Sequence, residues 1–298
     1  MRFVSLVLAL LPVGVFAGVI TDEQFEEIIT DVGTSPRIEI DNTAGSVRVV
    51  GQKTTDVTLS GKLSGKVKGV FIESAKGRVM IRVKSESGHG GWRDSGSANL
   101  TLSVPMASEL DIATVSAEID VGKVRGELRL KSVSGSIETD AYSDEVIAES
   151  VSGDVRIDGN GEPMEEVRLS SVSGDVIGRK LHGEIEASSV SGDIVIRDSY
   201  LSNGDFSTTS GDIEVGAEVL AGARIDFESV SGEVEYQIAG TIDGEYDIST
   251  FSGDIDNCFG PEPEERGRRN QRLRFEQGKT EHARIDITTM SGDIELCN

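Results

Sequence analysis

One short sequence, Ser-Val-Ser-Gly-Asp-Val, recurs in near copies along this chain of 298 residues. Its central glycine stands at Gly135, Gly153, Gly174, Gly192, Gly211, Gly232, Gly253 and Gly292. The first six intervals are 18 to 21 residues long, and the last is 39. A unit of about 20 residues is too short to enclose a core of its own, so each unit has to bury its apolar side against the next one. The repeat therefore predicts a solenoid.

Small or apolar residues alternate with polar ones on both sides of each glycine. Around Gly192 the inward set is Ile185, Ala187, Ser189, Ile194 and Ile196. Alternation predicts strands. The set lies at odd offsets before the glycine and at even offsets after it, and a straight strand cannot change parity, so the chain must turn a corner there. We expect glycine at this corner because it accepts a positive φ.

Two short strands around a corner, closed by a turn such as 158–165, would make one coil. Equivalent strands of successive coils then stack in parallel, and the handedness of parallel crossovers favours a right-handed coil. We expect an all-β fold, a right-handed parallel β-solenoid (β-helix) with coils of about 20 residues.

The first 17 residues have the features of a secretory signal peptide. Arg2 is followed by an apolar run over 3–16, and Val15-Phe16-Ala17 fits a cleavage signal. The run is shorter than the ~20 residues that span a bilayer. No other long apolar run follows, so no transmembrane segment is expected after cleavage. The predicted location is the periplasm, the cell surface or the extracellular space.

The rest of the chain divides into three parts. Residues 18–35 form an N-terminal segment in which Thr21-Asp22-Glu23-Gln24 resembles a capping box. Phe25, Ile28 and Ile29 follow at helical spacing, which predicts a short helix that caps the open end of the stack. Residues 36–110 carry the repeat in degraded form and predict an irregular solenoid part, and 111–298 form the regular part.

The charge balance excludes some partners. Asp and Glu number 52 against 29 Lys and Arg, a net charge of -23. Nucleic acids and anionic lipid surfaces both favour clustered basic residues, so we expect no nucleic-acid partner. The balance is compatible with divalent cations.

The two cysteines, Cys258 and Cys297, each stand five residues after a repeat glycine. They therefore occupy the same column of the solenoid, about one strand spacing of ~4.8 Å apart if one coil and a loop separate them. That spacing lies within the range of a disulfide, and export would supply an oxidising compartment. We predict a disulfide between them. Two free thiols are the alternative.

An acidic residue follows most of the repeat glycines, and Asp154, Asp175, Asp193 and Asp212 form the centre of this column. Stacked carboxylates repel each other, so something must compensate. The favoured interpretation is that each carboxylate accepts hydrogen bonds from N–H groups of the corner. The alternative is calcium held between coils by these four side chains. We expect no other cofactor.

Repeated serines beside the glycines suggest a nucleophile, but no histidine stands near them in a recognisable triad arrangement. His89, His182 and His282 are scattered along the chain. Hydroxyl ladders that support a tight corner are the favoured interpretation.

Two insertions break the repeat and supply the residues that differ from their neighbours. The first, over 85–98, contains His89, Trp92 and Arg93, which could contact a sugar ring. The second, over 260–271, contains Arg266, Arg268 and Arg269, which could hold an anionic glycan or a protein partner. Plain solvated loops are the alternative for both.

The Ser-Gly-Asp repeats, the step Leu102-Ser103-Val104-Pro105 and the paired terminal cysteines resemble a bacterial exported family named "putative adhesin", a β-strand-repeat domain of unknown function. The resemblance covers about Arg37 to Asn298. It implies a right-handed β-solenoid of the bacterial envelope, without catalytic residues that could be carried over.

We therefore expect a non-enzymatic envelope protein, an adhesin-like scaffold that binds a surface, an envelope glycan or an envelope protein. A polysaccharide-active β-helix enzyme and a calcium-stabilised scaffold are the alternatives.

Overall fold

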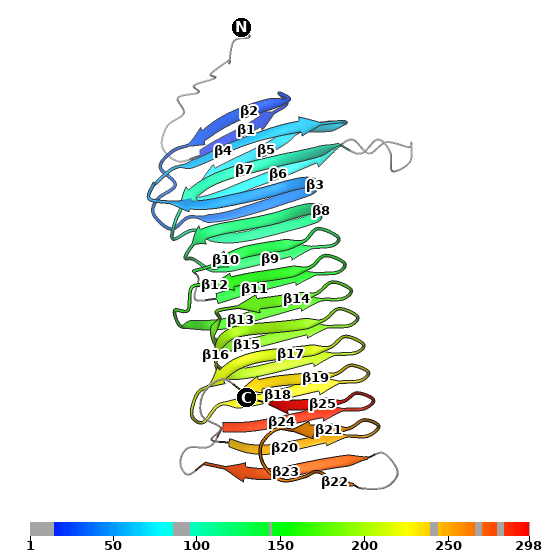
Figure 1. Cartoon of the computed structure of the whole chain (residues 1–298). Helices are drawn as coiled ribbons and strands as arrows, with labels where there is room; N and C mark the ends of the chain where they lie inside the picture. The colour runs from blue at the N-terminus through cyan, green and yellow to red at the C-terminus, as the bar shows by residue number, and fades with distance from the viewer. Residues whose placement is uncertain are drawn as a thin grey trace.

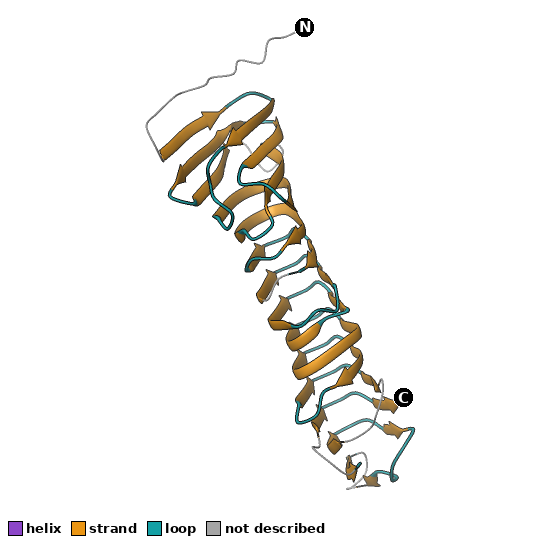
Figure 2. Cartoon of the chain, turned by 90° about the vertical axis from the view of Figure 1, so that its left-hand side faces the viewer, coloured by secondary structure: helices purple, strands orange, loops and turns teal. Residues whose placement is uncertain are grey.

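The computed structural model of the chain describes residues 15–85, 96–142, 145–238, 244–265, 270–278 and 283–297. All helical or extended secondary structure described there is β-strand, and the 25 strands join in one continuous sheet. The sheet folds into two facing layers around an apolar core, which gives a long, narrow stack (Figures 1 and 2). The all-β prediction is confirmed.

The corner glycines divide the strands between the two layers. Strands that precede a corner form the first layer: β9 (Leu128–Ser132), β11 (Glu145–Ser150), β13 (Met164–Ser171), β15 (His182–Ser189), β18 (Arg224–Ser229), β20 (Gly244–Thr250) and β24 (Ala283–Thr289). Strands that follow a corner form the second layer: β10 (Ile137–Ala141), β12 (Val155–Gly159), β14 (Val176–Arg179), β17 (Ile213–Val219), β19 (Val234–Ile238), β21 (Ile255–Asn257) and β25 (Ile294–Cys297). Three longer strands contribute to both layers: β3 (Arg37–Gln52), β8 (Glu109–Val124) and β16 (Ile194–Thr208).

The strands pair so that equivalent positions of successive repeats lie side by side. Val155 of β12 lies opposite Ile137 of β10 on one side and opposite Val176 of β14 on the other, in parallel. Burial alternates along the strands, and it changes parity at the corner as expected: Ala148 and Ser150 are buried before Gly153, and Val155 and Ile157 after it. Each coil thus adds one layer of side chains to a continuous core.

The N-terminal end of the stack is built from antiparallel strands. These are β1 (Val15–Ile20), β2 (Gln24–Ile29), β4 (Val57–Ser64), β5 (Val67–Ala75), β6 (Arg78–Ser85) and β7 (Ser97–Pro105). Strands β6 and β7 lie parallel to β3, whereas β5 and β4 return antiparallel to them, and β1 and β2 form the outermost pairings. This end of the stack therefore mixes parallel pairings with antiparallel ones, among which β5 and β6 form a hairpin.

The short helix predicted after Thr21 is wrong, because that segment is strand β2. Phe25 and Ile29 point inward with a two-residue alternation, and Ile28, with 57% of its surface exposed, points outward. The edge of β4 explains this outcome: as a strand, β2 pairs with the backbone groups of β4, whereas a helix would bond only within itself and leave that sheet edge open.

The C-terminal coil does not lie at the end of the stack. Strand β24 pairs with β18 on one side and β20 on the other, and β25 lies between β19 and β21. Residues 244–257 therefore form the next coil but one after β18 and β19. The chain then returns, and residues 283–297 form the coil between the two. Strand β23 (Gln271–Gln277) covers β20, and the short β22 (Glu264–Glu265) covers β23 (Figure 1).

Candidate functional site

A buried hydroxyl supports the corners of the central coils from inside. Ser171 Oγ accepts a hydrogen bond from the N–H of Gly174 at 2.9 Å and donates one to the carbonyl of Gly153 in the preceding coil at 3.1 Å. Ser150 and Ser189 repeat this pattern with their own glycines. The hydroxyls therefore join each turn to the next coil, as the ladder interpretation predicts.

Successive corners stack so closely that they require glycine at this position. A Cβ atom on Gly192 would stand 2.0 Å from the carbonyl oxygen of Gly174, and one on Gly174 would stand 2.3 Å from that of Gly153. None of these three glycines has a positive φ, so the expectation that glycine supplies that conformation is wrong here. The corners instead approach so closely that no side chain fits between them.

The corner carboxylates form a second ladder on the outside. Asp154 Oδ1 accepts the backbone N–H of Asp175 at 3.1 Å, Asp175 accepts that of Asp193 at 3.0 Å, and Asp193 accepts that of Asp212 at 2.9 Å. Asp212 continues the ladder to Glu233. Each carboxylate is thus held by the next coil rather than by its own turn. Calcium binding by the four aspartates stays a prediction.

These carboxylates have no cationic partner within the described residues. Arginines of the described residues pair across the strands of the two layers, for example Arg168 with Glu186 and Arg197 with Glu214, both at 2.8 Å. No corner carboxylate forms such a pair within that part of the chain. Partial burial, and then the charges of Asp212 and Asp293, raises the pKa of Glu233. The corner edge is therefore strongly acidic.

An apolar column runs beside the acidic one. The residue two positions before each corner glycine, or before Ala117 in the first regular coil, is exposed and mostly apolar. We call this column the corner ridge: Val115, Val133, Val151, Val172, Val190, Val230, Met290 and Phe251, in the order of the stack. Between 43% and 68% of each side chain is exposed. Thr209 occupies the equivalent place in the coil between Val190 and Val230.

The corner ridge lies on the turns along the right-hand side of Figure 1. The inward set expected from the sequence leaves out the valine of the repeat and gives it no role. The available signal was an apolar residue that returns at an outward position in almost every copy. Exposed apolar surface of this extent is typical of interaction sites.

The ridge widens into a groove at its C-terminal end. The groove has a volume of about 820 Å³ and runs past β15, β16, β18, β24 and β20. Val230, Met290 and Phe251 form one wall, and Ser207, Glu228 and Thr288 lie on the other side. Met290 and Phe251 are the most exposed residues of the ridge, at 59% and 68%.

The residues predicted from the two insertions cannot be placed. His89, Trp92 and Arg93, and likewise Arg266, Arg268 and Arg269, lie outside the described residues. Arg272, just after the second insertion, donates hydrogen bonds to both carboxylate oxygens of Asp247, at 3.0 and 2.8 Å. His182 packs on the ring of Tyr200, away from the corner serines.

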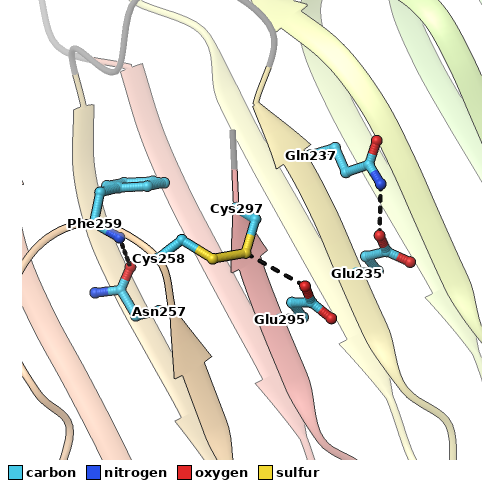
Figure 3. The surroundings of a disulfide bond; sticks show 7 residues. All are labelled: Glu235, Gln237, Asn257, Cys258, Phe259, Glu295 and Cys297. Atoms are coloured by element: carbon cyan, nitrogen blue, oxygen red, sulfur yellow. Dashed lines mark hydrogen bonds between the residues drawn. A yellow bond between two sulfur atoms is a disulfide. The ribbon is translucent and has the colours of Figure 1, made fainter.

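Cys258 and Cys297 are joined by a disulfide in the structure, with their Cα atoms 5.0 Å apart (Figure 3). Cys297 ends β25, and Cys258 follows β21, so the bond links the inserted coil to the outer one. Glu295 Oε1 lies 3.3 Å from the Sγ of Cys297. In the part of the chain that is described, these three residues are the one group close enough to hold a metal ion, and both sulfur atoms are already bonded to each other.

Three solved structures are similar to this chain at low sequence identity. A "putative lipid binding protein" from Parabacteroides distasonis is 13% identical with a TM-score of 0.49. A "putative adhesin" from Bacteroides fragilis is 12% identical with a TM-score of 0.44, and one from Parabacteroides distasonis is 13% identical with a TM-score of 0.41. Each alignment covers 92% of this chain and 97% of the other. No argument about function rests on likenesses at this level.

A search of curated proteins found no match. Among the described residues, no helix is long and apolar enough to cross a membrane. The family comparison is decisive, because the family described as Toastrack DUF4097 matches residues 35–297, which include every corner and the disulfide. This chain belongs to the Toastrack DUF4097 family.

Proposed function

We propose that this protein is a non-enzymatic scaffold of the bacterial envelope that binds an envelope component along its corner edge. The observation that carries the proposal is the corner ridge, an exposed apolar column that returns coil after coil. Solenoids present long surfaces suited to extended partners, and the ridge gives this surface an apolar centre.

The repeat itself supports a structural rather than a catalytic role for its polar residues. The corner hydroxyls of Ser150, Ser171 and Ser189 bond to backbone groups, and the Asp154 and Asp175 carboxylates do the same. A general acid or base needs a group free to exchange a proton with a substrate. We therefore favour binding over catalysis.

Export through a signal peptide over 1–17 is part of the proposal. Cleavage after Ala17 would remove the first half of β1 and leave Gly18–Ile20 beside β5. The disulfide supports the same location, because such bonds persist in oxidising compartments. We also propose a right-handed stack of coils of about 20 residues, because parallel crossovers are almost always right-handed.

Retention on isolated envelope tests the proposal. Val151→Ser, Val172→Ser and Val190→Ser together remove the centre of the corner ridge, and Thr209 indicates that a hydroxyl residue is tolerated in this column. We expect at least a fivefold loss of retention. Leu220→Ser, which removes an exposed apolar residue outside the corners, is the matched control and should bind like the wild type.

Equal retention of the wild type and the triple variant would contradict the proposal. Turnover of a polysaccharide by the purified protein would favour an enzyme instead.

A further inference from the structure

We propose that the groove at the C-terminal end of the corner ridge binds an extended, uncharged glycan chain. This inference rests on the proposed binding role and names the class of ligand. The groove lies between successive corners.

The shape of the groove fits a linear ligand. It follows five successive coils, which stack in the order β15, β16, β18, β24 and β20. With a strand spacing of ~4.8 Å, four steps span about 19 Å. One coil is about as high as one pyranose ring is long in an extended β-linked chain, so successive rings would meet successive coils. Its volume of about 820 Å³ falls within the usual range of ligand sites.

The two walls have different chemistry. Val230, Met290 and Phe251 form an apolar wall, and the Phe251 ring is 68% exposed. Thr288 and Glu228 on the other side are exposed polar groups. A pyranose ring has an apolar C–H face and a polar hydroxyl edge, so it matches both walls at once. An acyl chain would leave the polar wall without partners.

Charge excludes the acidic members of the ligand class. Glu228 lies in the groove, and Glu233, Asp293 and Asp254 follow the corners beside it. No corner carboxylate has a cationic partner among the described residues. A uronic acid chain or an anionic lipid headgroup would meet uncompensated repulsion here. The ligand is therefore not anionic, and within the glycan class an uncharged chain fits this site.

Calorimetric titration tests the inference with the full disulfide-bonded protein. The probes are β-1,4-linked hexamers of glucose and of N-acetylglucosamine, and a galacturonate hexamer is the anionic control. We expect one or both uncharged hexamers to bind and the anionic one not to bind. Phe251→Ala should weaken the binding at least tenfold, because truncation removes the exposed ring without opening a cavity in the core. Val133→Ala, in the same column outside the groove, should leave it unchanged.

No binding of either uncharged hexamer would overturn the inference, and so would equal affinities of the wild type and Phe251→Ala. If envelope retention still depends on the central valines in that case, the proposed function stands and only the glycan assignment fails. If neither assay detects binding, both fail.

Discussion

In the central coils, three residues of each corner perform three different tasks. The glycine lets one turn approach the next, the buried serine or threonine joins them by hydrogen bonds, and the aspartate carries the outer ladder. Because all three tasks concern the stacking of coils, substitutions should act on stability in ways that differ by position.

Gly192→Ala should destabilise the protein by at least about 3 kcal/mol, because its Cβ would overlap the Gly174 carbonyl oxygen and the turn would have to move. Gly222→Ala is the control. Gly222 has open space around it but a φ of 77°, so only the ordinary cost of the left-handed conformation, about 1–2 kcal/mol, applies. Urea denaturation measures both, and equal losses would contradict the stacking explanation.

Ser171→Ala should cost about 1–3 kcal/mol, because it leaves the buried N–H of Gly174 and the carbonyl of Gly153 without their side-chain partner. Ser229→Ala at the equivalent position should be nearly neutral, because that hydroxyl has no partner to lose. Thermal or urea unfolding of Ser171→Ala and Ser229→Ala measures the two stability losses. A large loss in Ser229→Ala would show that its hydroxyl is bonded after all.

Stability should also depend on the protonation of Glu233. Burial and the neighbouring carboxylates raise the pKa of Glu233 in the folded state, so the proton binds more tightly there than in the unfolded chain. The protonated Glu233 side chain therefore stabilises the folded state. This stabilisation is fully present below the pKa of the unfolded chain and is lost as the pH rises through the pKa of the folded state. Glu233→Gln should raise the urea midpoint at pH 7.5 by an amount worth less than about 0.5 kcal/mol, and leave it unchanged at pH 4. A lower midpoint at pH 7.5 would contradict this sign.

At the scale of elements, alternation identified the regular strands because each faces a core on one side only. The helix prediction failed at β2, where a capping-box sequence and helical spacing were outweighed by an open sheet edge. The order of the last coils could not be predicted either. Successive copies of the repeat are almost interchangeable as neighbours, so the sequence does not show that β24 and β25 fill the gap before β20 and β21.

The disulfide should stabilise this unusual return of the chain. It closes a loop with a sequence separation of 39, and chain entropy assigns about 4 kcal/mol to a loop of that size. Cys258→Ser with Cys297→Ser should lower the free energy of unfolding by about that amount. Chemical denaturation under non-reducing conditions measures the difference. Two titratable thiols in the denatured wild-type protein would show that the bond does not form.

At the scale of the whole molecule, the described part of the chain is a long, narrow stack (Figure 2), and its corner edge carries the corner ridge and the ladder of carboxylates. The scaffold was predictable because every coil obeys the same spacing. The candidate site was less predictable. The valine between the two serines looks like an ordinary exposed residue in one copy, and it becomes part of an apolar column only when the coils stack. The groove arises where Thr209 interrupts the column and the inserted coil brings Met290 between Val230 and Phe251, and neither feature can be read from one repeat.

Hydrogen–deuterium exchange of the protein bound to isolated envelope tests the binding edge most directly. We predict that binding slows exchange in the corner turns around 133–135, 172–174 and 230–232, and leaves the turns of the opposite edge, around 160–162 and 220–222, unchanged. Protection of the opposite edge, or no protection at the corners, would contradict the proposal that the corner ridge is the binding surface.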